Sequence, residues 1–243
     1  PEERIRDEMH HRIDKALNHW RLRFFVGFGH FAIAGALLSN ACVFPDAEFI
    51  DTNGIRMALY EQGSGPAVIF VHGFPELAFS WRHQLPALAD AGFRAIAPDM
   101  RGYGQTDAPV DLAAYCLTEL VADLEGLLDS LGLDNAIFVG HDWGAMLLWQ
   151  MATLVPHRFK RLVALNIPHL PRTATDPIAL MRARFGEDFY IVDFQDSDEA
   201  DTAFAADPAH FFTMMMRKNQ LSRDQFNRLP AEKKVLSLRT LMA

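Results

Sequence analysis

The segment Gly140-His141-Asp142-Trp143-Gly144 places a carboxylate between glycines and between two apolar runs. The run before it, Ala136–Val139, predicts a buried strand, and the run after it, Ala145–Trp149, predicts the start of a helix. A strand, a sharp turn and a helix form a nucleophile elbow, in which the neighbours of the reactive residue must be small. The reactive position here is Asp142, and a carboxylate nucleophile attacks carbon and forms an ester with the enzyme. We therefore predict chemistry at a strained or activated carbon–heteroatom bond rather than acyl transfer.

A second segment, His72-Gly73-Phe74-Pro75-Glu76, follows the apolar run Ala67–Val71. A backbone N–H of such a loop and that of the residue after the nucleophile can together form an oxyanion hole. These donors would be the amides of Phe74 and Trp143, and a cis bond before Pro75 would shape the turn. Taken alone, the segment also fits a plain strand-to-helix turn, and only the elbow downstream favours the site. The residues expected to support the two turns are His72, Gly73, Pro75 and His141.

A third segment, Asp99–Asp107, is rich in glycine and follows another predicted strand. The carboxyl ends of strands are where α/β sheets place their sites, so a functional role is one interpretation of this segment. We favour a structural role, in which Arg101 makes hydrogen bonds and the glycines form turns.

The elements that would position these segments alternate regularly from residue 47 onward. An Asn53-Gly54 pair predicts a hairpin between strands 47–52 and 55–61. This order of elements indicates an α/β fold with a mostly parallel sheet and an antiparallel N-terminal hairpin. Apolar runs and periodic apolar residues predict further strands at 67–71, 93–98, 135–140 and 161–167, and helices at 80–91, 117–131, 145–155 and 178–185.

The composition argues against several classes of function. With 243 residues, half of them hydrophobic and 22% charged, the chain has room for one sizeable domain. The formal net charge of −8 argues against a nucleic-acid partner. Cys42 and Cys116 form neither a disulfide framework nor a zinc-binding spacing, and no dinucleotide fingerprint occurs. We therefore expect neither a metal nor another cofactor.

Residues 24–45 contain no Asp, Glu, Lys or Arg. Their most apolar part, Phe24–Leu38, is shorter than the ~20 apolar residues that a membrane span needs. The residues Ser39-Asn40-Ala41 loosely fit the cleavage site of a secretory signal. We favour a helix packed on the body of the protein and expect a cytoplasmic location. Membrane association or export through residues 24–45 is the alternative.

Four segments, taken in order, resemble the epoxide hydrolases of the α/β-hydrolase superfamily, the branch with an aspartate nucleophile. They are His72–Glu76, Ser80-Trp81-Arg82, Asp99–Gly104 and Gly140–Gly144. The resemblance extends from about Ala47 to Gln195 and implies an α/β-hydrolase fold with a helical lid. The expected parts are an N-terminal helical and apolar extension (1–46), the N-terminal part of the hydrolase core (47–168) and the lid (169–243).

The resemblance implies that Asp142 opens an epoxide to an alkyl-enzyme ester, which water hydrolyses to a vicinal diol. The partners would then be a small-molecule epoxide and water, without a cofactor. The amides of Phe74 and Trp143 would hold the oxyanion, and the Trp143 ring would line the pocket floor. In the family, a lid tyrosine in a Tyr-x-x-x-Phe-Gln pattern hydrogen-bonds the epoxide oxygen, and here Tyr190 followed by Phe194-Gln195 matches it. A phenol can share its proton with an alkoxide leaving group.

The sequence departs from the family pattern after the elbow. Family members complete the triad after the lid with an acid and a histidine, and they carry a second lid tyrosine. Hydrolysis of the ester needs a general base, so a chain that ended at Ala243 would react once and stall. We therefore expect these residues to be part of a longer enzyme. The second lid tyrosine is not found in this sequence. The base is not found either, because the downstream histidines His157, His169 and His210 lack the sequence context of the family's base.

Two other functions remain open from the sequence. Haloalkane and fluoroacetate dehalogenases share the aspartate elbow but need donors that bind a halide. Haloalkane members usually carry a polar residue where Phe74 stands, and fluoroacetate members carry an arginine where Trp143 stands, so the sequence favours an epoxide. The failure to find a base histidine fits a non-catalytic protein of the hydrolase fold that binds an apolar ligand or a partner. The retained Asp142 and Tyr190 argue against this function.

Overall fold

The computed structural model describes residues 44–169, 175–187 and 189–196, together with residues 202, 205–209 and 213. The chain falls into two compact units, residues 1–169 and 170–243, and each is described by itself. The division into extension, core and lid stays a prediction. Most of the apolar segment 24–45 lies outside the described residues. Within the described part of the chain, no helix has the length and apolar character that crossing a membrane requires.

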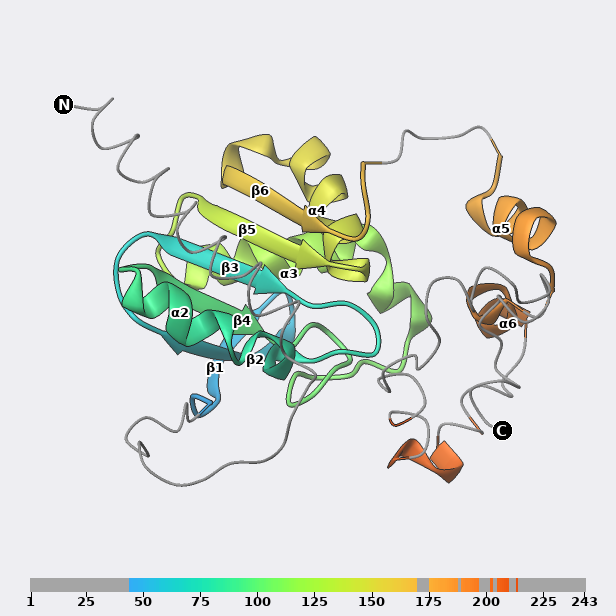
Figure 1. Ribbon diagram of the computed structural model, residues 1–243, viewed down its shortest axis with the longest axis horizontal. Helices are drawn as coiled ribbons and strands as arrows, with labels where there is room; N and C mark the ends of the chain where they lie inside the picture. Colours follow the sequence, from blue (N-terminus) through green and yellow to red (C-terminus); the bar gives the residue numbers. More distant parts are fainter. Residues whose placement is uncertain are drawn as a thin grey trace, which may run out of the picture. The chain divides into compact units, whose positions relative to one another are not determined.

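A six-stranded mixed sheet forms the centre of the first unit (Figure 1). Its strand order is β1-β2-β4-β3-β5-β6, in which β1 and β2 pair antiparallel and β4, β3, β5 and β6 run parallel. This confirms the predicted α/β fold with an antiparallel N-terminal hairpin. The strands are β1 (Glu48–Thr52), β2 (Ile55–Gln62), β3 (Ala67–Val71), β4 (Arg94–Pro98), β5 (Ala136–His141) and β6 (Phe159–Leu165).

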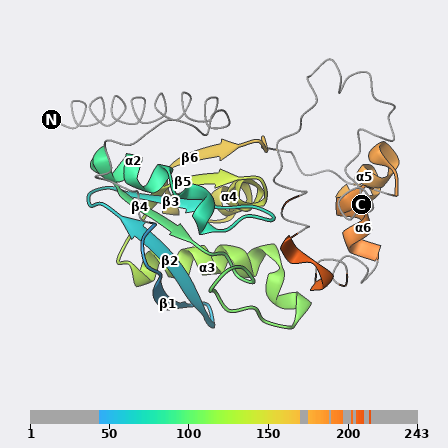
Figure 2. The same ribbon diagram turned by 60° about the horizontal axis from the view of Figure 1, so that its bottom comes forward.

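Helices cover both faces of this sheet, as Figure 2 shows for α2 and α3. On one face, α3 (Leu117–Ser130) and α4 (Trp143–Leu154) pack against the strands and share a buried apolar cluster with them. On the other face, the short helix η1 (Ala78–Trp81) and α2 (Gln84–Asp90) form a second cluster. All five residues of β3 are buried because the strand is covered on both faces, which explains its continuous apolar run. Two further short helices are η2 (Leu112–Tyr115) and η3 (Pro156–Arg158).

The hairpin between β1 and β2 forms where the sequence predicts it. Asn53 and Gly54 have φ values of 42° and 75°, which is the left-handed pair that a two-residue hairpin turn requires. The turn sets the antiparallel register in which Thr52 opposes Ile55.

The predicted helix over residues 80–91 is wrong in its continuity. The structure instead has η1, which ends at Trp81, and a separate α2, which begins at Gln84. The cause is Pro86, because its ring in a continuous helix would clash with the carbonyl group of Arg82, four residues earlier. The loop after β3 is therefore followed first by η1 and then by α2.

The last predicted strand of the first unit is displaced. It was expected over 161–167, whereas β6 begins at Phe159 and ends at Leu165. Asn166 ends the strand because it has a φ of 67°, which lies in the left-handed region. Among residues with a side chain, asparagine is one of the few that adopt this conformation readily.

In the second unit, the described helices are α5 (Pro177–Phe185) and α6 (Tyr190–Asp196). Asp176 caps α5, since its carboxylate accepts the N–H of Ile178 at 3.0 Å. Gly186 ends the helix with a φ of 90°. The helix predicted over 178–185 is therefore confirmed.

Candidate active site

Asp142 stands at a sharp turn between the last residue of β5 and the first residue of α4. Its backbone has φ 53° and ψ −123°, a strained conformation of the kind that costs roughly 1–3 kcal/mol and that clusters at functional sites. The neighbouring glycines leave room for the turn. A Cβ atom on Gly144 would lie 2.6 Å from the carbonyl oxygen of His72, and one on Gly140 would lie 2.8 Å from the amide nitrogen of Ala145. The segment is therefore an elbow in geometry as well as in sequence.

The loop after β3 lies directly against this elbow. The backbone N–H of Phe74 donates to Oδ1 of Asp142 at 3.2 Å. A Cβ atom on Gly73 would lie 2.6 Å from Cβ of Asp142, so only glycine permits this approach. A cis peptide bond joins Phe74 to Pro75, as the sequence suggested. The carboxylate is half-buried, so one oxygen is held by the loop while the group stays reachable from solvent.

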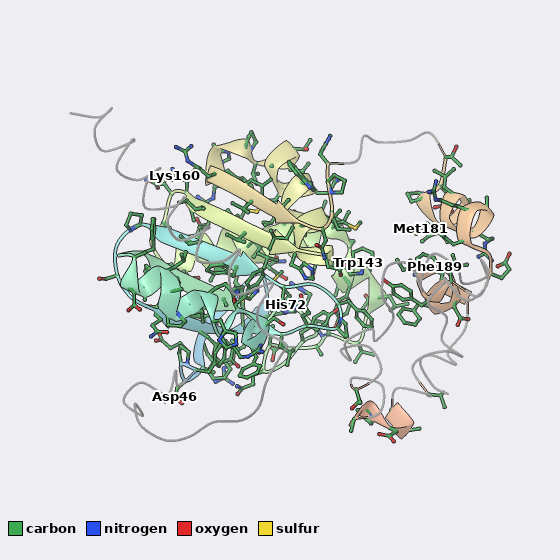
Figure 3. The ribbon with its side chains drawn as sticks, viewed as in Figure 1. Asp46, His72, Trp143, Lys160, Met181 and Phe189 are labelled. Carbon is green, nitrogen blue, oxygen red and sulfur yellow. The ribbon has the colours of Figure 1, made fainter. Side chains whose placement is uncertain are left out.

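Trp143, whose N–H is the second expected donor, is the first residue of α4. The first N–H groups of a helix have no carbonyl partner within it, and the positive end of the helix dipole favours negative charge there. The Trp143 side chain is 45% exposed. Trp143 and His72 both lie at the end of the sheet toward which the β3 and β5 arrows point, and Lys160 lies at the opposite end (Figure 3).

His72 serves as a structural link between two strands. Its Nε2 accepts the N–H of Met100 at 3.0 Å, so Nδ1 carries the proton and donates to the carbonyl oxygen of Gly73 at 2.9 Å. Burial lowers the pKa of His72 below its ordinary value, which keeps the ring neutral. The side chain thus fixes the start of the loop that carries Phe74.

A polar chain that the sequence does not reveal lies beside the elbow. Nδ1 of His141 lies 2.7 Å from Oε2 of Glu76, and Nε2 of His141 lies 2.6 Å from Nδ2 of Asn166. Glu76 also accepts the N–H of Gly73 at 3.3 Å. His141 and Glu76 belong to the motifs that were singled out, but their pairing joins residues 65 positions apart, and no local pattern encodes it.

Two pKa shifts follow from this chain. The hydrogen bond to Glu76 raises the pKa of His141 above its ordinary value, against the opposing effect of burial. Burial alone would raise the pKa of Glu76, but the hydrogen bond and charge of His141 lower it below the usual range. Asp142 adds to the raised pKa of His141 through its negative charge. A basic histidine and an ionised carboxylate therefore lie next to the elbow.

Tyr103 also approaches the site from the loop after β4. Its ring packs edge-on against His72, with ring centroids 5.0 Å apart. Burial raises the pKa of Tyr103, and the negative charge of Asp142 raises it further. The phenol therefore stays protonated beside the carboxylate.

The loop Asp99–Asp107 is structural, as the sequence favoured. Arg101 forms two hydrogen bonds with the buried carboxylate of Asp123, from Nε at 2.8 Å and from Nη2 at 2.5 Å. Asp99 accepts the N–H groups of Ala78 at 2.9 Å and of Gln105 at 3.1 Å. These bonds tie the loop to α3 and to η1.

Tyr190 is the first residue of α6 in the second unit. Its ring makes edge-to-face contacts with Phe189 and Phe194, at centroid distances of 5.1 and 5.5 Å. Its predicted approach to Asp142 joins the two units and stays a prediction. Among the described residues, no group of three His, Cys, Asp or Glu side chains could hold a metal ion.

Comparison with known proteins places the chain in a family. The family model for the alpha/beta hydrolase fold matches residues 66–239, so the chain belongs to the α/β-hydrolase family. Several of its relatives within that family are epoxide hydrolases. Epoxide hydrolase A of Mycobacterium tuberculosis is 47% identical over 175 residues, which are 71% of this chain and 54% of that protein. Epoxide hydrolase 3 of Siraitia grosvenorii is 48% identical over 165 residues, 67% of this chain and 52% of that protein.

The solved structures agree with these relatives. Epoxide Hydrolase A from Mycobacterium thermoresistibile superposes with a TM-score of 0.71 at 41% identity, covering 81% of this chain and 68% of that one. Epoxide hydrolase VrEH1 from Vigna radiata gives a TM-score of 0.68 at 37% identity, covering 76% of this chain and 61% of that one. The family resemblance drawn from the four sequence segments is therefore confirmed. The chain spans about half the length of the curated relatives it matches.

Proposed function

We propose that this chain carries the nucleophilic part of an epoxide hydrolase site, which acts on a small-molecule epoxide and water. The observation that carries the proposal is the half-buried Asp142 carboxylate at a strained elbow, with Oδ1 held by the N–H of Phe74 at 3.2 Å. The similarity to epoxide hydrolases at 47 and 48% identity supports an epoxide over a haloalkane.

In the first step, a lone pair of Asp142 Oδ2 attacks an epoxide carbon while Oδ1 stays bound to Phe74. The ring C–O bond breaks, and its electron pair goes to the epoxide oxygen. That alkoxide takes a proton from an acid, for which Tyr190 is the proposed donor. The product is a β-hydroxyalkyl ester of Asp142.

In the second step, water adds to the carbonyl carbon of this ester, and a general base takes the proton of the water. The charge develops on the former carboxylate oxygen, where the N–H groups of Phe74 and Trp143 are proposed to stabilise it. The bond between the carbonyl carbon and the alkyl oxygen then breaks, and the alkyl oxygen takes the remaining proton of the added water. The base passes its proton to the phenolate of Tyr190, which restores the acid of the first step. This step releases a vicinal diol and restores the carboxylate of Asp142, which now holds an oxygen atom from water.

The test is an intact mass spectrum of the protein before and after incubation with a small aryl epoxide, together with an assay for the diol. We expect either a gain of one epoxide mass, mapped by peptide digestion to the elbow, or formation of the diol. Consumption of a bromoalkane without any reaction of the epoxide would instead favour a dehalogenase. Absence of both adduct and diol, in a folded sample, would contradict the proposal.

Replacing Tyr190 by phenylalanine should slow alkylation by about 10²-fold, the lower end of the range for a general acid. The ring remains, so the contacts with Phe189 and Phe194 are retained and the change removes only the hydroxyl group. The measurement is the rate of adduct formation by rapid quench and mass spectrometry. An unchanged rate in Tyr190→Phe would remove Tyr190 from the proposed site.

We also propose that the protein acts in the cytoplasm. The proposed reaction needs only an epoxide and water, so it needs no partner from outside the cell. Cell fractionation with detection of the full chain tests this location. Recovery in the membrane or in the medium would favour the alternative role for residues 24–45.

A further inference from the structure

The chain of polar groups beside the elbow ends at Asn166, which the proposed reaction does not use. Asn166 directly follows Leu165, the β6 residue that pairs with His141 in the sheet. Its amide nitrogen Nδ2 lies 2.6 Å from Nε2 of His141, while the other ring nitrogen lies 2.7 Å from Oε2 of Glu76. The imidazole is therefore held from both sides, by one residue that follows β3 and one that follows β6.

The two partners of His141 favour different protonation states. The carboxylate of Glu76 favours the imidazolium, which agrees with the raised pKa of His141. The amide nitrogen of Asn166 is only a donor, so it fits a neutral ring whose Nε2 carries no proton. Once Nε2 is protonated, two donors would face each other at this distance. Only the amide oxygen of Asn166 could then accept the bond.

The backbone around Asn166 is fixed, whereas its side chain has room to turn. The N–H of Ile167 donates to the carbonyl oxygen of Leu165 at 2.9 Å, and the indole N–H of Trp149 donates to the carbonyl oxygen of Ile167 at 3.0 Å. The φ of 67° at Asn166 is one that asparagine tolerates. The Asn166 side chain is exposed, so rotation of its amide displaces no buried group.

We propose that Asn166 is a positioning residue of the elbow that stabilises His141 in both protonation states, presenting its amide nitrogen to the neutral ring and its amide oxygen to the imidazolium. The described titratable groups around this pair are Glu76 from the β3 loop, Asp142 from the elbow and, through its charge interaction with Glu76, the buried His72. The consequence for activity rests on the proposed function. The positive charge of the imidazolium stabilises the carboxylate of Asp142, and alkylation neutralises that carboxylate, so the alkylation rate should rise as pH rises and His141 loses its proton.

The test is a pH titration of the His141 ring nitrogens by NMR in the full chain, with His141→Gln used to assign the signals. Asn166→Gly removes the amide while suiting the positive φ, and Asn166→Asp leaves an acceptor that cannot donate. We expect the Gly variant to keep the titration midpoint, because the amide supports both states. We expect the Asp variant to move the midpoint to higher pH, because both its acceptor and its charge favour the imidazolium.

Each other result overturns the inference. A higher titration midpoint of His141 in Asn166→Gly would mean that the amide of Asn166 only donates to the neutral ring. A lower midpoint would mean that it only accepts from the imidazolium. An unchanged midpoint in Asn166→Asp would mean that the contact has no influence on His141. The matched control is Asn135→Asp, which adds the same charge at an exposed position just before β5, at the far end of the strand from His141. It should leave the midpoint unchanged.

Alkylation kinetics separate this inference from the proposed function. In Asn166→Asp, the rise of the alkylation rate should move to higher pH together with the NMR midpoint. In Asn166→Gly, the rate should fall about two- to tenfold at every pH, the size expected for one lost hydrogen bond. If the unmodified chain forms neither adduct nor diol, the proposed function fails, whereas the NMR titration still decides the role of Asn166.

Discussion

Replacing Asp142 by asparagine should abolish covalent capture of an epoxide, with a loss of about 10⁴-fold or more, the scale seen when a catalytic nucleophile is removed. The amide that replaces the carboxylate carries no negative charge and has no oxygen lone pair of comparable reactivity. Asparagine tolerates the φ of 53°, and its carbonyl oxygen can still accept the N–H of Phe74. The elbow should therefore persist while its chemistry is lost. The measurement is the time course of adduct mass after mixing with a small aryl epoxide.

The matched control for this change is Asp134→Asn, which alters the same residue type at an exposed position before β5. It should react at the rate of the unmodified chain. Both variants should unfold at the same denaturant concentration as the unmodified chain, so that a loss of reaction cannot reflect unfolding. Adduct formation in Asp142→Asn at a rate close to that of the control would show that the nucleophile lies elsewhere.

The elbow and the sheet could be predicted from the sequence because their signals are local. Gly140 and Gly144 stand where any side chain would collide with neighbouring atoms, so the glycines directly record the sharp turn. The continuous apolar run of β3 records burial on both faces of the sheet. The Asn53-Gly54 turn is likewise predictable, because both positions need a positive φ that these two residue types adopt readily.

Other features could not be read in this way because they depend on which distant residues meet. Glu76, His141 and Asn166 come from three different strand ends, and only the folded register brings them together. The break before α2 has a local cause in Pro86, but the periodic apolar residues around Pro86 favoured one continuous helix. The proposed approach of Tyr190 to Asp142 would depend on how the second unit packs, and neither motif encodes that packing.

Replacing Asp123 by asparagine should lower the free energy of unfolding by about 3–5 kcal/mol, the usual cost of removing one partner of a buried ion pair. Asp123 is fully buried, and the side chain of its partner Arg101 is 4% exposed. Asparagine keeps one oxygen but turns a donor toward a guanidinium group that can only donate. The charge of Arg101 would then be buried without the carboxylate that it binds. Urea denaturation followed by circular dichroism measures the change.

The same helix α3 offers the control that makes this prediction specific. Asp129 also pairs with an arginine, Arg158, but its side chain is 69% exposed. Asp129→Asn should therefore change the stability by less than about 1 kcal/mol, as expected for an exposed ion pair. Equal losses in the two variants would show that burial does not set the strength of the Arg101–Asp123 pair. A loss confined to Asp123→Asn would show that burial sets the strength of the pair that ties the loop after β4 to α3.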